Sequence, residues 1–220
     1  GTGNYNTSET IELSQEAEKI GVDGVLLVVP YYNKPPQEGL YQHFKTIAEH
    51  VHLPCMLYNV PSRTSLNMTD QTTLRLSHVD NIVGVKEASS DLNQIARIID
   101  GAPSGFRVWS GNDDETFPIM AMGGYGVVSV LSHLVGSQIK QMMGLLLEGD
   151  VEKAGAEHRR LLPIFKIMFT VANPIPIKYS LNHAGFHVGM PRLPLVDPDE
   201  HVAASINQVV SNYKIDLPLN

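Results

Sequence analysis

Short apolar runs alternate with longer stretches of helical periodicity along the first two thirds of the chain. The expected strands are residues 24–29, 55–59, 82–86, 107–110 and 127–130. The first of these is apolar on both faces, which is typical of a strand buried in a parallel sheet. Helices are expected between the runs, beginning with one that Ser8 caps and Gly21 ends. Strands that alternate with helices in this way predict a parallel α/β fold.

The last third of the chain has a different pattern, because only helical periodicity continues beyond about residue 133. Helices are expected over residues 135–148, 151–169, 175–184 and 198–213. The segment Asn173-Pro174-Ile175-Pro176 interrupts them, since each proline removes a backbone donor and disfavours helix in the residue before it. We therefore expect a partial β/α barrel over residues 1–149 and a C-terminal helical domain over residues 150–220.

The composition excludes several classes of protein. A net charge of -7 over 220 residues makes nucleic acid and anionic membranes unnatural partners. No apolar stretch reaches the length of about 18 residues that predicts a membrane span. The single cysteine, Cys55, lies in an apolar run and rules out a disulfide within the chain, which favours a reducing, cytoplasmic location.

Polar and aromatic side chains gather where the expected strands end. Tyr31 and Tyr32 follow the first strand, Tyr58 ends the second, and Lys86 ends the third. Ser110, Gly111 and Asp113 lie at the end of the fourth. In a β/α barrel the active site forms at the carboxyl ends of the strands, so we expect these side chains to lie near one another.

Lys86 is the candidate nucleophile. Desolvation at the end of an apolar strand lowers the pKa of a lysine, and a neutral amine can attack a ketone to form an imine. The alternative is a lysine that reaches solvent or pairs with Glu87. Tyr58 is a candidate proton relay, or else a half-buried core tyrosine. Arg63 is suited to gripping a carboxylate, or else it is a solvated surface residue.

Metal chemistry is not expected, although the chain has nine histidines. The pair His183 and His187 has the spacing of one helical turn. A helix through both would include Gly185, and no third ligand is evident. No metal or cofactor is therefore predicted.

Four separated motifs together resemble one family. They are Pro30-Tyr31-Tyr32-Asn33-Lys34-Pro35, Tyr58-Asn59-Val60-Pro61-Ser62-Arg63-Thr64, Gly84-Val85-Lys86-Glu87-Ala88 and Asn173-Pro174-Ile175-Pro176-Ile177-Lys178. In this order they resemble 4-hydroxy-tetrahydrodipicolinate synthase (dihydrodipicolinate synthase). The resemblance implies a (β/α)8 TIM barrel with a C-terminal helical domain. It also implies a homo-oligomer that condenses pyruvate with L-aspartate 4-semialdehyde in lysine and diaminopimelate biosynthesis.

The resemblance also implies roles for individual residues. Lys86 corresponds to the lysine that forms the pyruvate imine, Tyr58 to the proton relay, and Arg63 to the arginine that binds the carboxylate of the aldehyde substrate. Tyr32 corresponds to a tyrosine lent to a neighbouring subunit's site, and the backbone of Val128 to part of the pyruvate pocket. Glu9 and Tyr31 correspond to residues of an allosteric lysine site.

Family members carry roughly three further βα units before the point that corresponds to Gly1. The segment Gly1-Thr2-Gly3 is expected to be the end of the third strand. The missing part would hold the threonine of the proton relay, and five strands cannot close a barrel of eight. We therefore expect impaired synthase activity from these 220 residues and open sheet edges that a partner chain must cover.

Two alternatives to the synthase remain open on the sequence. The first is a related pyruvate-dependent aldolase of the N-acetylneuraminate lyase or keto-deoxy-sugar-acid type. The Pro61-Ser62-Arg63-Thr64 loop favours the synthase over the N-acetylneuraminate lyase, because a small charged aldehyde needs a fixed cation. The second is a non-catalytic, truncated remnant.

Overall fold

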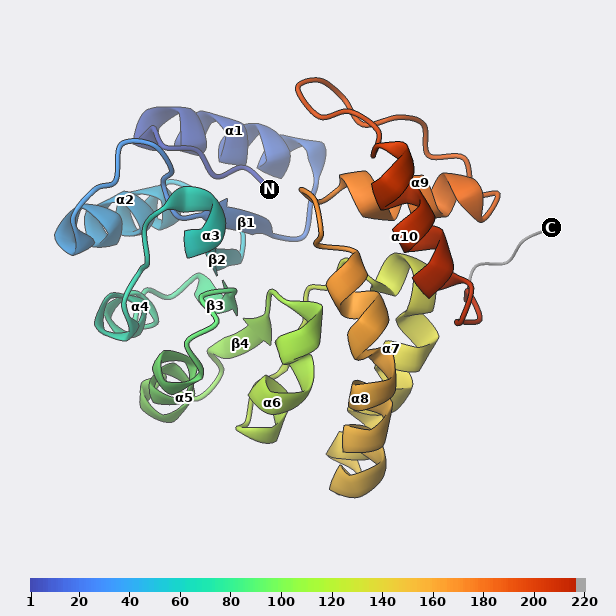
Figure 1. Ribbon diagram of the computed structural model, residues 1–220. Helices are drawn as coiled ribbons and strands as arrows, with labels where there is room; N and C mark the ends of the chain where they lie inside the picture. Colours follow the sequence, from blue (N-terminus) through green and yellow to red (C-terminus); the bar gives the residue numbers. More distant parts are fainter. Residues whose placement is uncertain (217–220) are drawn as a thin grey trace. The chain divides into compact units, whose positions relative to one another are not determined.

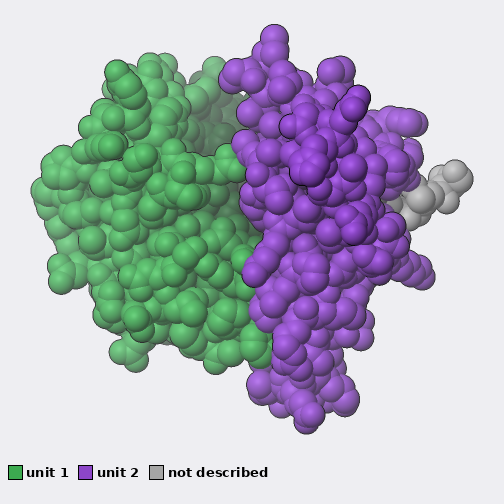
Figure 2. Space-filling view, viewed as in Figure 1, with its two compact units in different colours: residues 1–128 green, residues 129–220 purple. Residues whose placement is uncertain are grey.

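The computed structural model describes residues 1–216. The chain divides into two compact units, residues 1–128 and 129–220, which Figure 2 colours separately. The boundary that the sequence predicts after residue 149 falls instead between two helices of the second unit. The predicted boundary lies after the last helix that directly follows a strand. This boundary stays a prediction.

Unit 1 is built on a parallel sheet. Within residues 1–216 this sheet has five strands in the order β1-β2-β3-β4-β5. They are β1 (Val25–Val28), β2 (Cys55–Asn59), β3 (Ile82–Glu87), β4 (Arg107–Ser110) and β5 (Gly126–Val127). All four pairings are parallel, so the α/β fold predicted from the sequence is confirmed.

The last strand is shorter than the predicted residues 127–130. The Val128 amide still donates to the Ser110 carbonyl at 2.9 Å, in continuation of the pairing with β4. Beyond it the chain turns, because the Ser129 hydroxyl accepts from the amide of Ser132 at 2.8 Å, where the next helix begins. A serine that bonds the backbone three residues ahead favours the start of a helix over a further strand.

Helices α1 (Thr7–Ile20), α2 (Gln37–Glu49), α4 (Asp70–Leu76) and α5 (Leu92–Gly101) follow one another along one face of the sheet (Figure 1). The short α3 (Pro61–Thr64), the 3-10 turn η1 (Asp113–Glu115) and α6 (Thr116–Ala121) complete the unit. The predicted cap of α1 is wrong: Asn6, not Ser8, accepts from the amides of Ser8 and Glu9 at 3.0 and 3.3 Å.

The two faces of the sheet have different surroundings. The side chains of Leu27, Leu57 and Val85 are fully buried among the apolar side chains of the helices, which include Phe44 and Ile47. Alternate positions point to the other face, since successive side chains of a strand point in opposite directions. There the side chains of Tyr58 and Lys86 are only partly buried.

The N-terminal residues run beside β1. The Thr2 amide donates to the Leu26 carbonyl at 3.1 Å, although no strand is assigned to this stretch. The expectation that Gly1-Thr2-Gly3 is the end of a strand stays a prediction.

Unit 2 is helical in its described part. Its helices are α7 (Ser132–Leu147), α8 (Val151–Ile167), α9 (Ile175–His183) and α10 (Glu200–Val210). Leu134, Leu161, Phe165 and Ile206 are buried within it. Among residues 1–216, no helix combines the length and apolar character that crossing a bilayer requires.

The helix-facing core predicts how two isoleucines will differ. Ile47 near the end of α2 is 0% exposed, whereas Ile20 at the end of α1 is 80% exposed. Ile47→Ala should lower the free energy of unfolding by about 2–5 kcal/mol, because it leaves a cavity in a packed core. Ile20→Ala, the matched control, should change it by less than about 0.5 kcal/mol. Urea unfolding measures both, and equal losses would contradict this description of the core.

Candidate active site

Lys86 and Tyr58 are brought together by the register of neighbouring strands. Tyr58 of β2 pairs with Lys86 of β3, and the Lys86 Nζ lies 4.0 Å from the centroid of the Tyr58 ring. Both side chains are half-buried. The sequence-based expectation that these two strand ends converge is therefore met by direct contact.

Burial sets the protonation of this pair. Desolvation is the largest influence on Lys86 and lowers its pKa. The negative charge of Asp113 works in the opposite direction, and the positive charge of Arg63 lowers the pKa further. Desolvation also raises the pKa of the Tyr58 phenol, while Arg63 lowers it. Both shifts are toward the uncharged forms, the neutral amine and the neutral phenol, which a nucleophile and a proton donor require.

Arg63 belongs to the same site. It lies on α3, which begins at Pro61 directly after β2, and its amide donates to the Val60 carbonyl at 2.9 Å. Its charge acts on both Lys86 and Tyr58. The sequence placed Arg63 in a loop, and the tight helical turn holds it at the same strand end instead.

Asp113 was noted in the sequence as a strand-end residue without a role. Its side chain is almost fully buried, and its charge favours the ammonium form of Lys86. It therefore limits how far desolvation can lower the pKa of Lys86.

A glycine makes room for the lysine, and sequence reasoning missed this role. A Cβ on Gly111 would lie 2.8 Å from the Ala88 Cβ and 3.2 Å from the Lys86 Cε. A Cβ on Gly84, inside β3, would instead collide with the Arg107 carbonyl oxygen and the Trp109 ring, so this glycine admits the neighbouring strand β4. The only signal of Gly111 in the sequence is a glycine just after a strand, which turns also produce.

Val128 lies on the same sheet face as the pair. It lines an open apolar hollow together with Leu26, Met56 and Val83. Its role at a pyruvate pocket stays a prediction.

Tyr31 and Tyr32 form a separate group with Tyr5. The Tyr5 ring lies 5.2 Å from that of Tyr31 and 6.4 Å from that of Tyr32, centroid to centroid. The Tyr32 side chain is 86% exposed, and its φ of 72° is unusual for a residue other than glycine. The structure therefore does not bring Tyr32 to Lys86 within one chain.

Glu9 lies next to this aromatic group. Its carboxylate accepts from the Asn4 Nδ2 at 2.7 Å and from the Asn6 Nδ2 at 3.3 Å, on either side of Tyr5 in the chain. Glu9 and Tyr31 thus border the same short segment.

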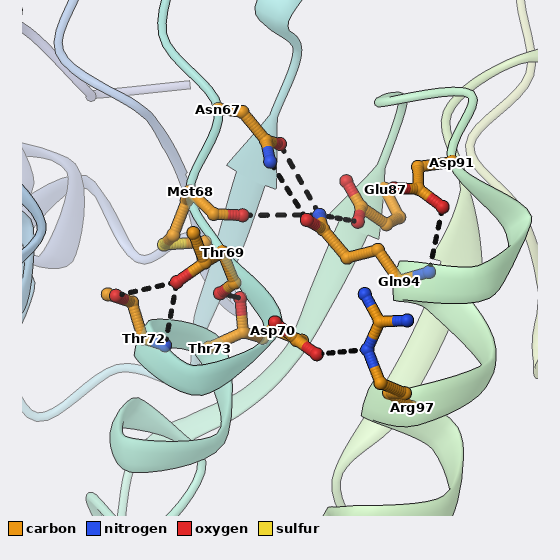
Figure 3. Close-up of polar contacts among 10 residues, drawn as sticks. All are labelled: Asn67, Met68, Thr69, Asp70, Thr72, Thr73, Glu87, Asp91, Gln94 and Arg97. Carbon is orange, nitrogen blue, oxygen red and sulfur yellow. Dashed lines mark hydrogen bonds and ion pairs between the residues drawn. The ribbon is translucent and has the colours of Figure 1, made fainter.

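A buried polar network lies on the helix-facing side of the sheet, opposite Lys86 and Tyr58. Figure 3 shows the part of it around Glu87 and Gln94. At its centre is Glu87, whose side chain is 0% exposed. Its carboxylate accepts from the Asn59 Nδ2 at 2.8 Å and from the Gln94 Nε2 at 3.0 Å. Because consecutive strand residues point to opposite faces, Glu87 does not pair with Lys86, and that sequence-based alternative is wrong.

The described residues contain no group of three histidine, cysteine, aspartate or glutamate side chains that could hold a metal ion.

The surroundings of Glu87 predict a pH-dependent stability. Burial raises the pKa of Glu87 from 4.5 to about 7, against the opposing effect of its hydrogen bonds. Between these values the folded chain keeps a proton that the unfolded chain releases, so stability falls as the pH rises. The separation corresponds to roughly 3 kcal/mol.

Glu87→Gln removes this titration while keeping the shape of the side chain. We expect the free energy of unfolding of the wild type, relative to this variant, to decrease between pH 4.5 and 7. Urea unfolding at a series of pH values measures the difference. Parallel curves for the two proteins would show that Glu87 titrates normally.

Comparison with known proteins gives consistent results. The model of the "Dihydrodipicolinate synthetase family" matches residues 1–213. A 4-hydroxy-tetrahydrodipicolinate synthase of Dehalococcoides mccartyi is 57% identical over 219 residues, which are 100% of this chain and 74% of the relative.

Solved structures agree. The dihydrodipicolinate synthase of Thermotoga maritima is 44% identical with a TM-score of 0.94, over 96% of this chain and 73% of that one. The enzyme of Cyanidioschyzon merolae with lysine bound is 43% identical with a TM-score of 0.94, over 96% and 72% of the two chains.

Proposed function

The chain belongs to the dihydrodipicolinate synthetase family, and we propose that it condenses pyruvate with L-aspartate 4-semialdehyde to 4-hydroxy-tetrahydrodipicolinate. This is the lyase chemistry of a class I aldolase, on the route to lysine and diaminopimelate. The observation that carries the proposal is the half-buried Lys86 amine, 4.0 Å from the Tyr58 ring and under the influence of Arg63. No cofactor is needed, because Lys86 itself supplies the amine that forms the imine with pyruvate.

The first step is attack of the neutral Lys86 amine on the pyruvate ketone. The carbonyl oxygen leaves as water and an imine forms, which draws electrons from the neighbouring methyl group. Loss of a methyl proton gives an enamine, whose carbon attacks the aldehyde of the second substrate. The substrate's own amino group then attacks the imine carbon, which closes the ring and releases Lys86.

Tyr58 is suited to moving the protons of these steps. Its ring lies 4.0 Å from the amine nitrogen, and burial raises the pKa of its phenol, which suits it to donate a proton to the departing oxygen and take it back later. Arg63 is suited to holding the substrate carboxylate, because a guanidinium presents paired donors. This specificity supports the synthase over an aldolase that acts on uncharged sugars. The backbone of Val128 would border the pyruvate.

We propose a homo-oligomer in which Tyr32 completes the site of a neighbouring subunit. The Tyr32 ring supports this, because it is exposed to solvent although it lies beside the Tyr5 ring. Glu9 and Tyr31, which border the same segment, are the proposed residues of a regulatory lysine site. The absence of a disulfide framework supports a cytoplasmic enzyme.

Trapping tests the imine directly. Incubation with pyruvate and borohydride should add a reduced pyruvyl group to Lys86, located by peptide mass spectrometry. Lys86→Arg should abolish the adduct, because a guanidinium does not form it. The control is borohydride without pyruvate. Absence of the adduct from the wild type would favour a chain that only binds or assembles.

A coupled assay tests the full condensation. The chain spans 74% of the length of the Dehalococcoides mccartyi relative. Arg63→Ala should weaken the use of aspartate 4-semialdehyde more than that of an uncharged aldehyde. Equal losses with the two aldehydes would contradict the proposed role of Arg63.

A further inference from the structure

The buried network behind Lys86 joins the two strands that carry the catalytic pair. Asn59 follows Tyr58 in β2, and Glu87 follows Lys86 in β3. The same register pairs Tyr58 with Lys86 and Asn59 with Glu87. The Asn59–Glu87 hydrogen bond of 2.8 Å therefore fixes, on the buried face, the alignment of the pair on the open face.

The network continues into the segment that follows α3. The Asn59 Nδ2 also donates to the Asn67 Oδ1 at 2.8 Å, and the Met68 amide donates to the Asn59 Oδ1 at 3.0 Å. This segment begins directly after the helical turn that carries Arg63. One side chain, Asn59, thus ties the strand of Tyr58 to the backbone beyond Arg63.

Helix α5 closes the network from the other side. The Gln94 Nε2 donates to Glu87 at 3.0 Å and to the Met68 carbonyl at 3.2 Å, while the Gln94 Oε1 accepts from the Asn67 Nδ2 at 2.8 Å (Figure 3). The backbone of Gln94 is also fixed, because its backbone N–H donates to the carboxylate of Asp91, the N-cap residue of α5, at 2.9 Å. The network therefore spans β2, β3, the segment after α3, and α5.

We propose that Glu87, Asn59, Gln94 and Asn67 form a positioning network that aligns Lys86, Tyr58 and Arg63 from behind the sheet. This inference rests on the proposed function and deepens it. Glu87 is a positioning residue here, because it touches none of the reacting atoms.

Stability alone does not account for such a network. In its charged form a fully buried carboxyl group bonded to neutral amides carries a large desolvation cost, and well-packed apolar residues would avoid that cost. What directed hydrogen bonds add is a unique geometry, since each donor must meet its acceptor. Here the fixed geometry is the alignment of the elements that carry the amine, the phenol and the guanidinium.

Glu87→Gln disrupts this arrangement for a specific reason. The variant side chain would place an NH2 group against the donors of Asn59 or Gln94. Neither side-chain amide can flip to present its oxygen without losing a hydrogen bond. The Asn59 Oδ1 already accepts from the Met68 amide, and the Gln94 Oε1 already accepts from the Asn67 Nδ2. The matched control is Ile98→Val, a change in a fully buried apolar residue of the same helix α5.

The first measurement needs no substrate. Lys86 is labelled with acetic anhydride at a series of pH values, and the label is located by mass spectrometry. The midpoint is the pH at which Lys86 reacts at half its maximal rate. All variants are labelled below their unfolding temperatures. We expect Glu87→Gln to move this midpoint upward, toward its value in the urea-unfolded chain, because a displaced amine gains water. Mere loss of a nearby negative charge would move it downward.

The second measurement is the rate at which borohydride traps the pyruvate imine. We expect a loss of about tenfold or more in Glu87→Gln, since displacement by a fraction of an ångström is costly in catalysis. Ile98→Val should keep both the wild-type midpoint and the wild-type trapping rate, even if its melting temperature falls by as much as that of Glu87→Gln.

The outcomes separate the two proposals. A midpoint that stays or moves downward in Glu87→Gln overturns the positioning network, as does an equal change in Ile98→Val. If the wild type forms no imine but the labelling midpoint still rises in Glu87→Gln, the proposed function is overturned and the network is supported. An upward midpoint together with slower trapping supports both.

Discussion

The parallel register of β2 and β3 is the constraint on which the site depends. It pairs Tyr58 with Lys86 on one face and Asn59 with Glu87 on the other. A slip of one residue would exchange the faces and bury the lysine among the helices. The pairing therefore decides both which side chains meet and which of them lose water.

The two faces of the β2–β3 pair have different roles: one face adjusts the pKa of Lys86, and the other holds a buried hydrogen-bond network. On the open face, partial burial lowers the pKa of Lys86, and the opposing charges of Asp113 and Arg63 adjust it. On the helix-facing side, the carboxylate of Glu87 is fully buried and accepts hydrogen bonds from the side-chain amides of Asn59 and Gln94. Reactivity needs some access to solvent, whereas fixed geometry benefits from its exclusion, and the sheet separates the two.

The sequence was sufficient where a local pattern had one physical outcome. The apolar runs predicted strands at residues 55–59 and 107–110, and β2 and β4 have these bounds. It was insufficient where side chains competed for the same backbone. Asn6 rather than Ser8 caps α1, and Ser129 starts a turn where a strand was expected to continue. In both places the outcome depends on a hydrogen bond that residue type alone does not select.

For the candidate site, the sequence by itself determined the reactive groups and the strand ends that carry them. Lys86, Tyr58 and Arg63 were evident as residue types suited to imine chemistry, and the family motifs connected them. Only the tertiary structure decided their surroundings: the tyrosine ring against the amine, the acid at Asp113, and the closed network around Glu87. The reason is physical, because desolvation and hydrogen-bond geometry arise between segments that are distant in the chain.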